Sequence, residues 1–331
     1  MIITRTPYRI SFFGGGTDYP SWYEQHGGQV LATTIDKYIY ISVRHLFPFF
    51  PHRIRLVYAK EELGDTVDDL THPTAREALK LLGLHQDLEI HYDGDLPARS
   101  GMGSSSAFTV GLLNALYTYC ERVVSTHQLA RDAIDVEQTR VGDTVGSQDQ
   151  ISAAYGGFNR IQFLTNGEII VRPVPVDKDR LILFSEYLML FFTGETRTAS
   201  DVASSYVSQL QSKRDRLSNL NSMVDTAIDI LCGVSDLKIL GDLLHEGWME
   251  KRALSPLIST DAINYLYQTA RNAGALGGKV LGAGGGGMFL LFAPPDVHTA
   301  VKNALSDFLH VPFQLEPFGS QVILGNHGSP H

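Results

Sequence analysis

The chain has 331 residues, of which 44% are hydrophobic and 19% are charged, and its formal net charge is −9 at pH 7. This length and composition are typical of a globular protein with one large or two ordinary domains. Because the chain is acidic and has no Lys/Arg-rich cluster, we expect no nucleic-acid partner.

No apolar run reaches the roughly 18 residues of a membrane-spanning helix, and the first residues lack the features of a secretory signal. We therefore expect a cytoplasmic protein without a membrane partner. The two cysteines, Cys120 and Cys232, lie far apart and lack metal-ligand spacing, so the sequence indicates neither a disulfide framework nor a zinc site.

The first half of the chain consists mainly of predicted β-strands. Runs rich in β-branched and aromatic residues are separated by Gly, Asp and Pro, and they lie at 6–13, 29–35, 37–45, 53–59 and 88–94. Helical spacing follows at 104–120, where Phe108, Leu112 and Leu116 share one face. A second helix is expected over 126–140, with Ser125 and Gln128 spaced as in a capping box.

The second half mixes strands and helices. We expect a hairpin over 156–176, a buried strand over 181–192, and helices from 200 to 231 and onward to 273. Further elements are expected in chain order: a strand at 279–282, a glycine turn, a strand at 288–293, a helix at 297–309 and a strand at 311–318. This order lacks a regular βαβ alternation, so it predicts an α+β fold. A domain boundary near residue 175 would separate 1–175 from 176–331.

Two general nucleotide-binding motifs can be excluded. No stretch has the G-x-x-x-x-G-K-[ST] pattern of a P-loop, because Lys279 is followed by Val280. Gly282, Gly284 and Gly287 fit G-x-G-x-x-G, but a predicted strand follows them where a dinucleotide-binding fold needs a helix.

The stretch SGMGSSSA over 100–107 has a different context. Gly101 and Gly103 permit tight backbone turns, and Ser104 begins the predicted helix. The unpaired N–H groups at a helix N-terminus, together with the helix dipole, form a site for phosphate, and a serine hydroxyl there can reach a metal ion. A helix cap in a serine-rich turn is the alternative role.

Two carboxylates follow this loop. Glu137 continues the apolar stripe of the second predicted helix through Ala130, Ala133 and Ile134, so it is expected to be paired with a cation or exposed to a cleft. A metal ion and an arginine are both possible partners. Asp149 lies near the start of a short predicted helix, where an acidic residue can also serve only to stabilise the helix dipole.

Three motifs together resemble those of the GHMP kinases, which include galactokinase, homoserine kinase, mevalonate kinase and phosphomevalonate kinase. They are TPYRISFFGGGTDY, LPARSGMGSSSA and KVLGAGGGGMFLLF, they follow the family's order, and the resemblance spans Arg9 to Phe292. The resemblance implies ATP and Mg²⁺ as cofactors. It also implies an N-terminal domain like ribosomal protein S5 domain 2, a ferredoxin-like C-terminal domain, and an active site between them.

The first motif departs from the galactokinase form, because Gly15 and Gly16 stand where galactokinases have Glu and His. Together with HPTAREALKLLG and FFTGETRTAS, it is most similar to the branch that phosphorylates D-glycero-D-manno-heptose 7-phosphate. That resemblance implies transfer from ATP to the anomeric hydroxyl, giving a heptose 1,7-bisphosphate for nucleotide-heptose and surface polysaccharide biosynthesis. The alternatives are a kinase for a free sugar such as L-fucose, and a catalytically silent sugar or nucleotide sensor.

The resemblance also implies roles for individual residues. Asp149 would be the base, Arg9 would lie by the reacting oxygens, and Ser105 and Glu137 would bind Mg²⁺. The triphosphate would contact Gly101, Met102, Gly103, Ser104, Ser105 and Ser106. The sugar phosphate would contact Gly14, Gly15, Gly16, Thr17, Asp18, Arg197, Gly284 and Gly285.

For the substrate's own phosphate we expect Arg197 as the main contact, with Arg76 and Lys279 as weaker candidates. A monomer and a homodimer are both compatible with the sequence.

Overall fold

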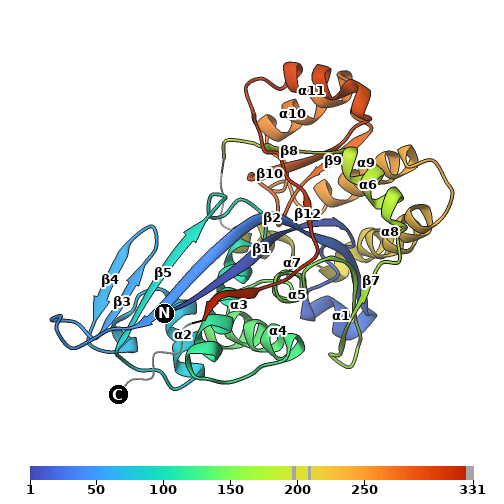
Figure 1. Ribbon diagram of the computed structural model, residues 1–331. Coiled ribbons are helices and arrows are strands. Elements are labelled where there is room, and N and C mark those ends of the chain that lie inside the picture. The colour runs from blue at the N-terminus through green and yellow to red at the C-terminus, as the bar shows by residue number, and fades with distance from the viewer. Residues whose placement is uncertain (196–198, 208–209, 326–331) are drawn as a thin grey trace.

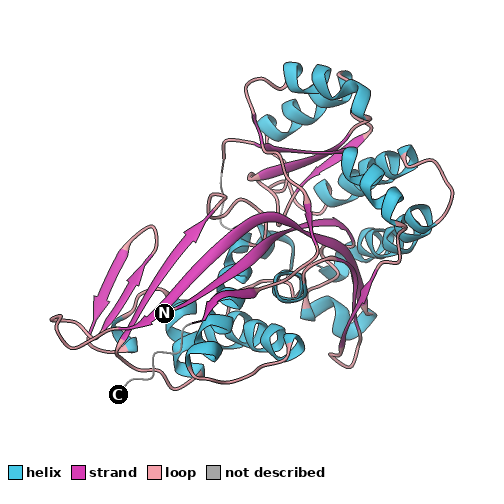
Figure 2. Ribbon diagram, in the orientation of Figure 1, coloured by secondary structure: helices cyan, strands magenta, loops and turns pink. Residues whose placement is uncertain are grey.

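The computed structural model describes residues 1–195, 199–207 and 210–325. Two β-sheets organise this part of the chain (Figures 1 and 2). A long, twisted sheet built mainly from the first half crosses the lower part of the view, and a smaller sheet from the second half lies above it with its own helices. The α+β fold expected from the sequence is confirmed.

The large sheet has nine strands in the described part of the chain, with the main order β13-β1-β2-β5-β3-β4. Only β3 and β5 pair in parallel, and the other pairs are antiparallel. The strands are β1 (Ile2–Phe13), β2 (Gly28–His45), β3 (Ile54–Val57), β4 (Glu61–Gly64), β5 (Leu88–Gly94), β6 (Phe158–Phe163), β7 (Ile169–Pro173), β12 (Leu315–Glu316) and β13 (Gln321–Gly325).

The long strand β2 joins the two ends of this sheet. Its first part, 28–33, pairs with β6, and its second part, 39–45, pairs with β5. The two strands predicted at 29–35 and 37–45 are therefore one continuous strand. The polar residues Asp36 and Lys37 do not interrupt it. The Asp36 carboxylate accepts the backbone N–H of Gln314, and the Asp36 N–H donates to the Gln314 carbonyl.

Four helices accompany the large sheet: α2 (Pro73–Leu81), α3 (Ser104–Tyr119), α4 (Thr126–Ile134) and α5 (Gln148–Tyr155). Helix α3 lies close against β1, because a Cβ atom on Gly111 would be 2.7 Å from Oγ1 of Thr6. The helix predicted over 126–140 continues from α4 as a π-helical segment, Asp135–Val141, which ends at Gly142 with φ of 79°. Such π segments are frequent at functional sites.

The small sheet has the order β11-β8-β10-β9. Its strands are β8 (Leu188–Phe192), β9 (Gly277–Val280), β10 (Met288–Phe292) and β11 (Leu309–His310). The remaining helices are α1 (Pro20–His26), α6 (Lys178–Glu186), α7 (Ala199–Val207), α8 (Arg214–Cys232), α9 (Lys238–Arg252), α10 (Asp261–Asn272) and α11 (His298–Ala304). Short 3₁₀ turns lie at Val67–Asp69, Leu210–Lys213 and Pro295–Val297.

The strand predicted over 181–192 is wrong in its first half. Asp177 caps a helix there, since its side chain accepts hydrogen bonds from the backbone N–H groups of Asp179 and Arg180. The strand begins only at Leu188, after that helix has ended.

The expected boundary near residue 175 falls between β7 and α6. The chain later returns, because β12 pairs with β2 and β13 pairs with β1. A division into 1–175 and 176–331 therefore stays a prediction. Among the described helices, none is long and apolar enough to cross a membrane.

Candidate active site

A cavity of about 330 Å³ lies where the large sheet, its helices and the second half of the chain meet. Residues of all three glycine-rich stretches line it, so the fold brings together segments more than 250 positions apart. The lining includes Arg9, Ser11, Gly15, Gly16, Asp18, Gly101, Gly103, Ser104, Ser105, Ser106, Gly146, Gln148, Asp149, Lys251, Lys279, Gly282, Ala283, Gly284 and Gly286.

The loop before α3 has the backbone geometry of an anion site. Gly103 occupies the N-cap position in the left-handed region with φ of 75°, and no side chain caps the helix. The first turn carries no acidic residue, so its N–H groups and the positive end of the helix dipole face the cavity.

The third glycine stretch lies directly against this loop. A Cβ atom on Gly101 would be 2.6 Å from the carbonyl oxygen of Leu281, and one on Gly287 would be 2.3 Å from the carbonyl oxygen of Ser100. The backbone N–H of Met288 also donates to the Ser100 carbonyl over 2.8 Å. Glycine is therefore needed at these positions because two backbones touch, and the third stretch fixes the loop before α3.

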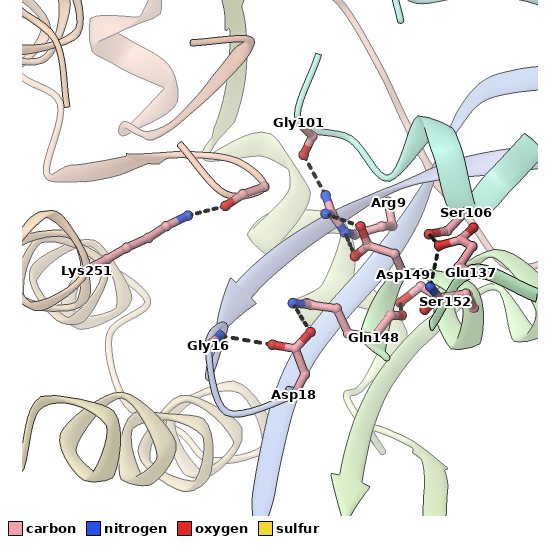
Figure 3. Close-up of polar contacts among 12 residues, drawn as sticks. Arg9, Gly16, Asp18, Gly101, Ser106, Glu137, Gln148, Asp149, Ser152 and Lys251 are labelled. Atoms are coloured by element: carbon pink, nitrogen blue, oxygen red, sulfur yellow. Dashed lines mark hydrogen bonds and ion pairs between the residues drawn. The ribbon is translucent and has the colours of Figure 1, made fainter. Parts of the chain in front are cut away.

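Buried Arg9 and half-buried Asp149 line the cavity and form a bidentate ion pair (Figure 3). The Arg9 Nε donates to Oδ1 over 2.6 Å, and Nη2 donates to Oδ2 over 2.8 Å. The third nitrogen, Nη1, donates to the Gly101 carbonyl over 2.8 Å. Arg9 thus connects β1, α5 and the loop before α3, and it holds the Asp149 carboxylate in one orientation.

Glu137 lies beside the first turn of α3 and is 1% exposed. Its carboxylate accepts hydrogen bonds from Ser106 (2.9 Å), Thr109 (2.5 Å) and Gln150 (2.6 Å). Burial raises the pKa of Glu137 to about 7, against the opposing effect of these three donors. No arginine pairs with Glu137 among the described residues.

The two expected Mg²⁺ ligands, Ser105 and Glu137, do not contact each other, and the role of Ser105 stays a prediction. Ser105 is exposed to the cavity, and it is the Ser106 hydroxyl that contacts Glu137. On the helix, one residue changes the direction of a side chain by about 100°, so of these two serines only one can face Glu137.

Glu137 and Ser106 offer the hard oxygen donors that Mg²⁺ prefers. The described residues contain no group of three or more His, Cys, Asp or Glu side chains that could hold a metal ion by itself. Such a sparse set fits a Mg²⁺ ion that takes its other ligands from nucleotide phosphates and water, as is usual for this ion.

Asp18 and Glu137 lie on opposite sides of the Arg9–Asp149 pair (Figure 3). Its carboxylate accepts the backbone N–H of Gly16 and the side-chain amide of Gln148, each over 2.9 Å. Burial, together with the nearby Asp149, raises the pKa of Asp18. A Cβ atom on Gly146 would be 1.9 Å from Oδ2 of Asp18, so glycine is required there for the carboxylate to keep its position.

Two buried polar atoms beside Asp18 have no hydrogen-bond partner among the described residues. They are Ser11 Oγ and Gln148 Oε1, and both side chains line the cavity. A Cβ atom on Gly15 would lie 3.8 Å from Ser11 Oγ and 3.9 Å from the Gln148 amide nitrogen, so Gly15 leaves room between them. Unpaired buried polar atoms are costly, which indicates that a polar ligand supplies the missing bonds.

Lys251 and Lys279 line the cavity from α9 and β9. Sequence reasoning considered Lys279 only as a weak candidate and missed Lys251, Ser11, Gln148 and Gly146. For Lys251 a signal was present, because it continues the buried helical face of Leu240, Leu244 and Trp248. A lysine on such a face needs an explanation.

Several predicted contacts are placed differently by the structure. Met102 lies in the core, and Thr17 is buried and donates to the carbonyls of Gly14 and Gln29. The Gly285 N–H donates to the Ile258 carbonyl, so it is occupied. Gly14, Thr17, Met102 and Gly285 do not line the cavity, whereas Gly284 does. These four residues shape the loops that carry the lining residues, and a direct contact of any of them with a ligand stays a prediction.

The remaining cation candidates differ in position. Arg76 lies on α2 and interacts with Glu77 and the Leu70 carbonyl, and it does not line the cavity. Arg197 lies outside the described residues.

Comparison with known proteins identifies the family. The model for the GHMP kinases N terminal domain matches residues 70–157, and the model for the GHMP kinases C terminal region matches residues 220–311. The chain is 30% identical over 233 residues to the mevalonate kinase of Methanothermobacter thermautotrophicus, covering 68% of this chain and 72% of that one.

Two further relatives cover almost the whole chain. A D-glycero-alpha-D-manno-heptose 7-phosphate kinase of Campylobacter jejuni is 28% identical over 305 residues, covering 89% of this chain and 90% of the relative. The crystal structure of a D-glycero-D-manno-heptose 1-phosphate kinase from Bacteroides thetaiotaomicron has the same fold, with a TM-score of 0.78 at 24% identity, covering 97% of this chain and 98% of that chain. The chain therefore belongs to the GHMP kinases, a family of ATP-dependent phosphotransferases.

Proposed function

We propose that this protein phosphorylates the anomeric hydroxyl of D-glycero-D-manno-heptose 7-phosphate with ATP, giving the 1,7-bisphosphate. The observation that supports a sugar most directly is the polar pocket around Gly15. There Asp18 offers a carboxylate, while Ser11 Oγ and Gln148 Oε1 are buried without partners. A polyol with several adjacent hydroxyl groups would satisfy all three side chains at once.

The choice of a phosphorylated heptose rests on two further points. One is the similarity to the heptose 7-phosphate kinase of C. jejuni along nearly the full length of both chains. The other is the opening at Gly15 and Gly16, where galactokinases carry larger side chains, because a seven-carbon sugar needs that space. This enzyme would therefore contribute to the synthesis of nucleotide-activated heptoses.

In the proposed reaction, Asp149 orients the anomeric hydroxyl and finally accepts its proton. Phosphoryl transfer passes through a loose transition state, so alignment and charge neutralisation matter more than strong base chemistry. The ion pair with Arg9 suits this role, because two hydrogen bonds hold the carboxylate in a fixed orientation. The loop before α3 would bind the triphosphate through its backbone N–H groups.

When bound, Mg²⁺ would supply charge neutralisation on the phosphate oxygens. Glu137 and Ser106 are the residues that would hold it, since they share a hydrogen bond at the base of the nucleotide loop.

ADP release measured across a panel of hexoses, heptoses and their phosphates tests the proposal. We expect D-glycero-D-manno-heptose 7-phosphate to give the highest kcat/KM. A clear preference for an unphosphorylated sugar such as L-fucose would contradict the proposed substrate but not the phosphotransferase activity.

A further inference from the structure

Two lysines reach the cavity side by side from the second half of the chain. Lys251 is in the last turn of α9, and Lys279 is in β9. Helix α9 lies directly on this strand, because a Cβ atom on Gly277 would be 2.0 Å from the carbonyl oxygen of Gly241. Both lysines therefore form one wall of the cavity, which we call the lysine wall.

Both ammonium groups are buried, and no carboxylate of the described residues contacts them directly. Lys251 is 8% exposed and Lys279 is 7% exposed. The Lys251 Nζ donates to the carbonyls of Val280 (3.1 Å) and Gly282 (2.5 Å). The Lys279 Nζ donates to the Phe12 carbonyl over 2.7 Å. Neither forms an ion pair within the described part of the chain, although an unpaired buried charge is expensive.

The carboxylates of the cavity are already engaged elsewhere. Asp149 is paired with Arg9, and Asp18 accepts from Gly16 and Gln148. Burial, followed by the positive charge of Arg9, lowers the pKa of Lys251 to about 7. Burial and the neighbouring Lys251 also lower the pKa of Lys279. The free cavity therefore disfavours the charged form of both lysines.

A bound dianion would stabilise the charged form of both lysines. An ammonium carries three donors, of which Lys251 uses two and Lys279 uses one, so donors remain on both. A phosphate monoester brings a charge of about −1.5 to −2 near pH 7 and three acceptor oxygens. We infer that Lys251 and Lys279 together bind the phosphate group that the sugar substrate already carries. This inference rests on the proposed function, since it concerns a phosphorylated sugar in the same cavity.

The position of Lys279 favours the sugar's phosphate over those of ATP. Its Nζ is bonded to Phe12 at the end of β1, immediately before the loop that carries Gly15 and Asp18. The triphosphate has its own site at the N-terminus of α3. The lysine wall therefore supplies the second anion site, for which the sequence favoured Arg197.

The test compares one sugar with and without its phosphate. Lys251→Met, Lys279→Met and the double variant are assayed at saturating Mg–ATP with D-glycero-D-manno-heptose 7-phosphate and with D-glycero-D-manno-heptose. We expect each single variant to raise KM for the 7-phosphate roughly 10- to 100-fold, the usual effect of losing a charged hydrogen bond. The KM values for ATP and for free heptose should stay within about twofold, because neither ligand carries that phosphate.

Lys238→Met is the matched control, because Lys238 begins the same helix and is exposed. It should leave all KM values unchanged. Lys279→Arg should recover part of the affinity for the 7-phosphate, since it restores the charge. Circular dichroism and thermal melting of each variant report whether the fold is retained.

A measurement on the unaltered enzyme covers the case in which the methionine variants do not fold. Inorganic phosphate should inhibit competitively against heptose 7-phosphate and not against ATP. Competition with ATP alone would overturn the inference.

The remaining outcomes separate the two proposals. If the enzyme uses heptose 7-phosphate and the folded lysine variants keep its KM, the lysine wall has only a structural role and this inference is wrong. If the unaltered enzyme rejects every sugar phosphate and uses free sugars, the proposed substrate and this inference both fail.

Discussion

The two walls of the cavity hold their charges in different ways. On the wall formed by β1, α5 and the loop before α3, the two carboxylates have partners within the described residues: Asp149 is paired with Arg9, and Asp18 accepts two hydrogen bonds. On the lysine wall, Lys251 and Lys279 contact only backbone carbonyls. Charged groups that already have partners are held in position before a ligand binds, whereas charged groups without a counter-ion are stabilised mainly by the ligand. Loss of the paired Asp149 on the first wall should therefore change kcat, and loss of a lysine on the second should change KM.

The largest effect is expected for Asp149→Ala. Loss of a positioned acid–base group typically lowers kcat by about 10²- to 10⁴-fold, and Arg9 would remain tethered to the Gly101 carbonyl. The affinity for ATP should change little, since the carboxylate does not belong to the loop before α3. Single-turnover kinetics and ATP titration measure the two quantities separately.

Asp179→Ala is the control for this variant. Asp179 also lies in the first turn of a helix, α6, but it is exposed and outside the cavity. If both substitutions had equally small effects on kcat, Asp149 would serve only its helix, and the catalytic assignment would be wrong.

Adjacent glycines of the first wall should differ strongly in their tolerance of a side chain. Gly14→Ala places a Cβ 1.9 Å from the Gln29 carbonyl at φ of 82°, and we expect a loss of roughly 2–4 kcal/mol in the free energy of unfolding. Gly15→Ala meets nothing closer than 3.8 Å and should cost less than about 1 kcal/mol.

Urea unfolding of the two glycine variants measures this difference. Gly15→Glu then places a large side chain between Ser11 and Gln148 and should raise KM for the sugar without unfolding the protein. Unchanged sugar kinetics in a folded Gly15→Glu variant would exclude this pocket as the sugar site.

The lysine wall should make stability depend on pH. Burial lowers the pKa of Lys251 from its ordinary value of 10.5 to about 7 in the folded protein. Between these two pH values, the unfolded chain therefore binds more protons at this lysine than the folded protein does. The free energy of unfolding should therefore rise with pH, by up to about 1.4 kcal/mol per pH unit from this lysine. Lys279 acts in the same direction, while Arg9, Asp18 and Asp149 are the charged groups that face the pair.

Guanidinium unfolding of the unaltered protein and of Lys251→Met at pH 7, 8 and 9 tests this dependence. The difference in stability between the two proteins should shift in favour of the unaltered protein as pH rises. A constant difference would mean that Lys251 titrates normally in the free enzyme.

The smallest effect is expected at the proposed metal site. Ser106→Ala removes the hydroxyl that contacts Glu137 and should raise the Mg²⁺ concentration for half-maximal activity roughly 10-fold. Ser105→Ala should shift it less, because that hydroxyl does not contact Glu137. A larger shift for Ser105→Ala in a Mg²⁺ titration would favour Ser105, the ligand expected from the sequence, over Ser106.

Local sequence patterns predict many of the helices and strands, but they do not predict the side-chain contacts that form the two walls of the cavity. Strand β1, helix α3 and the hairpin of β6 and β7 follow from hydrophobic periodicity and turn residues, and all are present. The motifs also lead to the family and to the cavity that contains Arg9, Asp18 and Asp149. Which serine faces Glu137 depends on where α3 begins, to within one residue, and sequence patterns do not predict a helix start that accurately.

The lysine wall depends on contacts between distant segments. Lys279 bonds to Phe12, 267 positions away in the chain, and Gly146 is required only because Asp18 lies against it. No local rule predicts such pairs. The same holds for α6, where the cap formed by Asp177 overrides an apolar run that favours a strand.

The most direct test of the account is the identity of the product. D-glycero-D-manno-heptose 7-phosphate is incubated with the enzyme and Mg–ATP, and the product is followed by ³¹P NMR. We expect a second phosphomonoester signal coupled to the anomeric proton, alongside the retained 7-phosphate. Turnover of free heptose or L-fucose with no new signal from the 7-phosphate would contradict it.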